Sequence, residues 1–339
     1  MKLYYTKKEK EMRRQEKKKT NLKSLILILL ITLVLLVSSS YAWFTSNQTV
    51  TVNQLQVNVQ AKNGLQISTD AKNWKSVLTT EDLDQAKVGA VYGANVNQIP
   101  TTMEPVSTAG NVTNGKLDMF YGITATDETT GDLTLTATKE TDKKGTEGRY
   151  IAFDLFLQVN KETPIYLTTK SKVEFTDPDS KGLENAGRVA FLVQGNVAPG
   201  TPFGTAQALN NATNDEVYIW EPNNDEHTEA AVAHALSMYE TTTTTAGAAP
   251  LTYYGINTEI TTPIKLQGKR DTVAQFTQVT PKIKTPKVMP KDQTFITLQP
   301  GVTKLRVYMW VEGEDVDCEN NASGVNIGYT LQFTATKPD

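Results

Sequence analysis

From about residue 45 onward, apolar and polar residues alternate with a period of two, and no other feature restricts the fold of this chain as strongly. Successive side chains of a strand point to opposite faces, so such runs predict strands with one buried face and one face in water. The runs are rich in Thr, Val, Tyr and Ile, which favour strands. They cover residues 50–52, 55–59, 133–137, 151–159, 189–193, 217–220, 295–298, 305–311 and 325–333, and Leu65 and Ile67 continue the early part of the pattern.

Turn signals separate these runs. They are Asn-Gly at Asn63 and Asn114, Asp-Pro at Asp177, Gly-Asp at Gly131 and Pro-Gly at Pro199. Many short strands with few helical patterns predict an all-β fold, a jelly-roll-like sandwich of two antiparallel sheets.

Residues 197–290 are expected to form a lobe inserted into this sandwich, because they are richer in Pro, Thr and Gly than the flanking strands. The lobe contains one short predicted helix over residues 228–239, with Thr228 as its N-terminal cap. Residues 281–290 hold three prolines, which favours an edge strand or a connector.

The N-terminus predicts export. A basic head, residues 1–23, precedes a hydrophobic segment, residues 24–42, which we expect to be helical. Ser40 and Ala42 are small residues placed for cleavage before Trp43. The alternative is an uncleaved anchor, because extending the apolar run to Phe44 gives 20 residues, about the length that spans a bilayer. Contact with the membrane through residues 24–44 is therefore transient or permanent, and residues 43–339 are the extracellular sandwich.

The charge distribution agrees with this orientation. Residues 1–23 carry ten Lys or Arg and three Glu, whereas the remainder carries 24 basic and 34 acidic residues. A basic head on an acidic body fits the positive-inside rule and does not indicate binding to nucleic acid. The only cysteine, Cys318, excludes a disulfide within the chain. We therefore expect a secreted or cell-surface protein of a Gram-positive bacterium.

The segment from Glu312 to Glu319 is strongly acidic. Glu312, Glu314, Asp315 and Asp317 offer hard oxygen ligands and form a candidate Ca²⁺ site, although the spacing is not that of an EF-hand. The alternative is a solvated acidic loop that follows the strand predicted over residues 305–311.

The two histidines of the chain, His227 and His234, lie seven residues apart. A metal site there would need a third ligand, such as Asp225 or Glu226. The alternative is a strand end, a turn and a helix cap.

No motif of a known catalytic class is present: the sequence lacks GxSxG, HExxH, a P-loop and GxGxxG. We therefore expect no enzymatic activity and, apart from Ca²⁺, no cofactor. Four aromatic residues are candidates for a face that binds carbohydrate: Tyr218, Trp220, Tyr253 and Tyr254.

Several stretches resemble a known group of proteins. Ala42-Trp43-Phe44-Thr45-Ser46-Asn47 is similar to the motif at the cleavage site of exported Firmicute proteins with a SipW-type signal, a group that includes TasA and the camelysin-like proteins. The stretches RVAFLVQ, YIWEPNND, LRVYMWVEGEDVDCENN and VNIGYTLQFTAT look like parts of related surface proteins. The resemblance implies a jelly roll, general secretory export, trimming by a dedicated signal peptidase, and assembly into fibres or a surface layer.

The segment after the cleavage site suggests a route to assembly. A strand freed by cleavage can add to an exposed sheet edge of a neighbour, and open head-to-tail contacts build a filament. The alternative is that this strand pairs within its own sheet. The residues assigned to the donated strand are Trp43, Phe44, Val50, Val52, Leu55, Val57 and Val59.

The leading hypothesis is thus a non-catalytic structural protein of a bacterial surface or biofilm matrix, whose partner is another copy or another surface protein. The alternative is a Ca²⁺-dependent adhesin or a carbohydrate-binding module, an argument from fold alone.

Overall fold

The computed structural model describes residues 49–60, 64–87, 97–175, 182–223, 226–233, 253–266, 268, 270–280, 282–283, 294–318 and 326–337. The chain divides into two compact units, residues 1–42 and 43–339, and every described residue belongs to the second. The predicted basic head and hydrophobic segment lie outside the described residues, as do Trp43 and Phe44. Among the described helices, none combines the length and the apolar character that a bilayer crossing requires.

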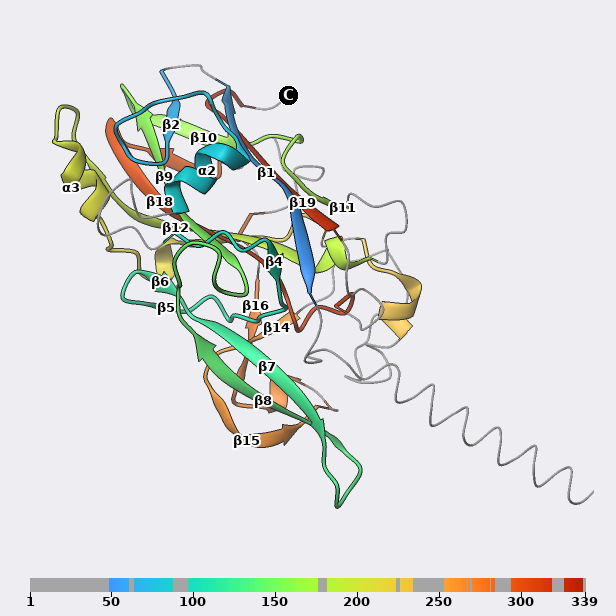
Figure 1. Cartoon of the computed structure of the whole chain (residues 1–339). Coiled ribbons are helices and arrows are strands. Elements are labelled where there is room, and N and C mark those ends of the chain that lie inside the picture. The colour runs from blue at the N-terminus through green and yellow to red at the C-terminus, as the bar shows by residue number, and fades with distance from the viewer. Residues whose placement is uncertain are drawn as a thin grey trace, which may run out of the picture. The chain divides into compact units, whose positions relative to one another are not determined.

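Two sheets packed face to face form the centre of the second unit (Figure 1). The strands of the first sheet are β1 (Val50–Gln60), β3 (Val77–Leu78), β4 (Thr102–Met103), β10 (Thr163–Leu167), β11 (Lys172–Phe175), β17 (Ile296–Leu298) and β19 (Asn326–Thr334). The strands of the second sheet are β2 (Gln66–Ser68), β9 (Ile151–Val159), β12 (Gly187–Val197), β13 (Val217–Trp220) and β18 (Gly301–Val311). The first sheet runs β17-β10-β19-β1-β3, with β11 also on β19 and β4 also on β1, and the second runs β13-β12-β18-β9-β2. The predicted all-β class is confirmed, and the facing sheets agree with a sandwich.

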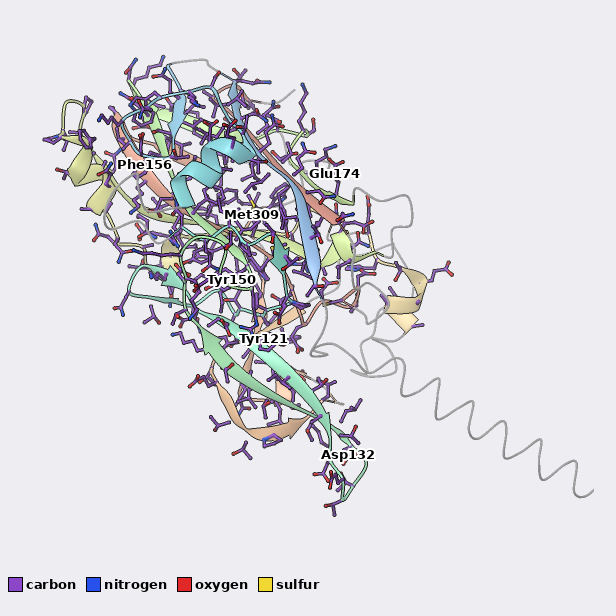
Figure 2. The ribbon with its side chains drawn as sticks, in the orientation of Figure 1. Tyr121, Asp132, Tyr150, Phe156, Glu174 and Met309 are labelled. Atoms are coloured by element: carbon purple, nitrogen blue, oxygen red, sulfur yellow. The ribbon has the colours of Figure 1, made fainter. Side chains whose placement is uncertain are left out.

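The main core lies between these sheets. Alternate residues of β9 and β18 enter it from one side, and residues of β1 and β19 enter it from the other. Met309 of β18 lies inside this layer, as Figure 2 shows. Among the residues that fill the core are Leu55, Val57, Leu155, Leu157, Val307, Met309, Leu331 and Phe333.

The other face of the second sheet is buried as well, so the prediction of one face in water is wrong for β9 and β18. Its apolar positions, among them Ala152 and Trp310, pack against a further layer that includes Met119. Its polar positions form buried ion pairs: Arg306 lies 2.9 Å from the Asp154 carboxylate and 2.7 Å from that of Asp142. The apolar and polar residues alternate here although both faces are buried, because the polar side chains form ion pairs with each other. Such pairing is needed, since a buried charge is costly without a partner.

The third sheet runs β15-β8-β7 and contains a long hairpin. The hairpin joins β7 (Met119–Thr126) to β8 (Leu133–Glu140), and β15 (Ile260–Lys265) adds to β8. Figure 1 shows this hairpin running away from the two central sheets, and Figure 2 shows Asp132 at its tip. Two short sheets complete the β-structure of the described residues. They are formed by β14 (Tyr253–Ile256) with β16 (Phe276–Val279) and by β5 (Val112–Thr113) with β6 (Lys116–Leu117).

The turn between β5 and β6 is one that the sequence predicts. Asn114 and Gly115 both have positive φ, 53° and 73°. A two-residue hairpin turn with both φ values positive is the type that Asn-Gly favours.

Within the described residues, helices are few and short. They are α2 (Thr80–Lys87), α3 (Phe203–Ala208) and the 3-10 turns η1 (Leu183–Ala186), η2 (Asn214–Glu216) and η3 (Arg270–Thr272). Residues 229–233 are helical too, and the Thr228 hydroxyl accepts a hydrogen bond of 3.2 Å from the Ala231 N–H. The predicted cap at Thr228 is thus confirmed, whereas residues 234–239 of the predicted helix lie outside the described residues.

The described residues between 197 and 290 are shared among several sheets rather than gathered into one inserted lobe. Strand β13 joins the second central sheet, β15 pairs with β8, and β14 pairs with β16. Composition suggested a lobe, but the apolar side chains of β13 are buried in the body, and this burial draws the segment into the central sheet. Of residues 281–290, Ile283 forms one bridge to Trp220.

The first and last strands of the body pair with each other. Strand β1 lies parallel to β19 from Thr51 beside Asn326 to Gln60 beside Thr334, with one register shift between Val52 and Gln54. Strands β3 and β4 occupy the other side of β1. Among the strand pairs described, this is the parallel one; the others are antiparallel.

This pairing corrects the expectation of a free strand after the cleavage site. Of the residues assigned to that strand, Val50, Leu55, Val57 and Val59 are buried in the core and Val52 packs against it. Residues 50–60 are therefore committed to their own sheet, as the alternative expected.

Candidate functional site

The acidic loop, defined here as residues 312–318, follows β18 and is buried. The exposed fractions of Glu312, Glu314, Asp315 and Asp317 are 0%, 5%, 2% and 1%. Two backbone hydrogen bonds hold the loop inside the body, from the Glu312 N–H to the Ala186 carbonyl at 2.8 Å and from the Gly313 N–H to the Val106 carbonyl at 2.9 Å. The alternative of a solvated acidic loop is therefore wrong.

Arg188, at the start of β12, lies at the centre of the charges around the loop. Its Nη2 is 2.6 Å from the Glu221 carboxylate and also contacts the carboxylate of Asp315. Its Nη1 donates to the carbonyl of Asn185 at 2.7 Å. Burial raises the pKa of Glu221 and the charge of Asp315 raises it further, while Arg188 acts in the opposite direction. One buried guanidinium thus joins β12, the end of β13 and the acidic loop.

Asp317 connects the loop to the segment before the helix. One of its carboxylate oxygens lies 2.6 Å from His227 Nδ1, and the other accepts 3.0 Å hydrogen bonds from the backbone N–H and the hydroxyl of Thr228. Burial alone would lower the pKa of His227. The hydrogen bond with Asp317 and the charge of Asp315 outweigh burial, so this pKa is raised.

Glu312 has a separate set of partners. Its carboxylate accepts hydrogen bonds from Trp310 Nε1 at 2.9 Å and from the Glu314 N–H at 3.1 Å. Complete burial raises the pKa of Glu312 to about 7, although its hydrogen bonds with Ser107 and Trp310 act against that rise. At the end of the loop, burial raises the pKa of the Cys318 thiol, which is the protonated and unreactive form at neutral pH.

The structure brings together residues from the two predicted metal sites: His227 from the histidine pair, and Asp315 and Asp317 from the acidic loop. Candidate ligand atoms of His227, Asp315 and Asp317 all lie within 4.8 Å of one another, and this group of described residues includes neither Glu312 nor Glu314. The four predicted Ca²⁺ ligands therefore do not form one oxygen cage. His234 and Asp225 lie outside the described residues, and Glu226 is exposed to solvent.

The predicted aromatic face is not supported. Trp220 has no exposed surface and belongs to the main core, so it cannot contact a ligand on the surface. Tyr218 is half-buried, and its ring packs edge-on against Phe295 at 5.6 Å between centroids. Tyr254 lies on β14 beside a different hydrophobic cluster, and the side chain of Tyr253 lies outside the described part of the chain.

Sequence reasoning missed Arg188 and Glu221. Each is a charged residue at the end of an apolar strand, Arg188 before VAFLVQ and Glu221 after VYIW. That position is a weak signal for a buried ion pair. The missing information is the register, which places Val189 opposite Trp220 and so brings the two neighbouring charges together.

Comparisons with known proteins found no matching family model, no matching curated protein and no matching solved structure.

Proposed function

We propose that this chain is an exported, non-catalytic structural protein of a bacterial cell surface or extracellular matrix, processed before Trp43 as in the proteins with a SipW-type signal. The single observation that carries the proposal is the parallel pairing of the first and last strands of the body. The basic head and the hydrophobic segment support export.

The parallel pairing suits a protein that bears load. The start of β1 and the end of β19 lie at opposite ends of their shared ladder, because the strands run in the same direction. Tension between the two chain ends therefore slides the strands along each other and loads many hydrogen bonds at once. The same number of bonds in an unzipping geometry would break one after another.

A force applied near Trp43 would act on β1. Trp43 precedes the first residue of β1 by only seven positions. A membrane or a neighbouring subunit that holds the chain near Trp43 pulls almost directly on β1. That strand is fixed between β19 on one side and β3 and β4 on the other.

Self-association through a donated N-terminal strand remains part of this proposal, but the donated strand is shorter than the sequence suggests. The burial of β1 restricts any donated strand to residues before Val50. A deletion of residues 43–53 would also remove Val50, whose side chain is 1% exposed in the core, and would confuse loss of assembly with loss of folding. A deletion of residues 43–48 leaves β1 whole.

The first test is assembly. We expect the chain that begins at Trp43 to form polymers in electron microscopy. The variant that lacks residues 43–48 should remain a folded monomer, with the melting temperature of the unpolymerised parent. Polymers of that deletion variant would rule out strand donation from this end.

The second test is location. In a Gram-positive host that carries a SipW-type signal peptidase, the body should be digested by protease added to intact cells or be found in the medium. N-terminal sequencing should begin at Trp43. Protein that stays protected inside intact cells would refute the proposed function as a whole.

A further inference from the structure

We draw no further inference here: the strongest candidate, the uncharged outer edge of β7 in the hairpin that runs away from the two central sheets, carries no proposal, because nothing in the described part of the chain shows what covers it.

Discussion

The guanidinium of Arg188 lies 2.6 Å from the carboxylate of Glu221, and both side chains are almost completely removed from water. The same guanidinium contacts Asp315, so a single cation serves two buried anions. Arg188→Met should therefore lower the free energy of unfolding by about 3–5 kcal/mol, because it leaves both carboxylates buried without their cation. Urea unfolding at neutral pH measures the change.

The matched control is Lys75→Met. Lys75 forms an ion pair with Asp82 at the surface, where half of the lysine side chain is exposed. Its loss should cost less than about 1 kcal/mol, since water and salt screen exposed pairs. Equal small losses for both variants would mean that Arg188 does not stabilise the buried carboxylates.

The buried carboxyl of Glu312 predicts a pH dependence near neutrality. Burial raises its pKa to about 7, above the value of 4.5 for the free side chain. The folded state holds the proton more tightly than the unfolded state. The resulting stabilisation is complete below pH 4.5 and is lost as pH rises through 7.

Glu312→Gln removes this titration while retaining a similar shape. As the pH rises from 5 to 8, the unfolding free energy of the parent should therefore fall relative to that of Glu312→Gln. The shift amounts to roughly 3 kcal/mol at most, at ~1.4 kcal/mol per pKa unit. Denaturant titrations in EDTA across this range measure it, and a constant difference would contradict the raised pKa.

Two glycines form a matched pair for a steric prediction. A Cβ added at Gly255, in β14, would lie 1.9 Å from the Thr108 carbonyl oxygen, whereas a Cβ at Gly204, in α3, would meet nothing within 4 Å. Gly255→Ala should cost about 1–3 kcal/mol or more, the usual range for overpacking. Gly204→Ala should be neutral or stabilise by up to about 1 kcal/mol, because alanine favours helix. Thermal unfolding of both variants tests the pair, and equal melting temperatures would show that β14 can move away from Thr108.

The β1–β19 ladder predicts that resistance to force depends on direction. Handles attached through Thr49→Cys and Lys337→Cys pull the start of β1 against the end of β19 and shear the ladder. Handles at Thr49→Cys and Asn326→Cys pull at one end and unzip it. The buried Cys318 does not compete for labelling.

We expect the shear pair to unfold at a higher force than the unzipping pair in single-molecule pulling. Comparable forces in the two directions would remove the mechanical support for the proposed function.

Strand positions were largely predictable from the sequence, whereas strand partners were not. The alternation over residues 151–159 and 217–220 gives β9 and β13 with their observed bounds. Alternation does not reveal what covers the second face, so Arg306 and Asp154 suggest a face in water although they pair with each other inside the body. The parallel partner of β1 was also hidden, because register and strand order depend on contacts between distant segments.

The candidate site shows the same limit. Its residue types were evident, since the acidic loop and His227 each suggested metal ligands. Their combination was not, because Asp317 and His227 are 90 residues apart. The four acidic residues also have different partners inside the protein. Glu312 accepts a hydrogen bond from Trp310, whereas Asp315 forms an ion pair with Arg188.

The pairing of β1 with β19 also sets the order of events when the chain folds. Among the described strands, β1 is the first in the chain and β19 is the last. Strand β1 therefore cannot pair with β19 until nearly the whole chain is available. Closing so long a loop is slow, and a partly made chain leaves the edge of β1 open to other strands. That edge stays open to unwanted pairing until the final strand arrives.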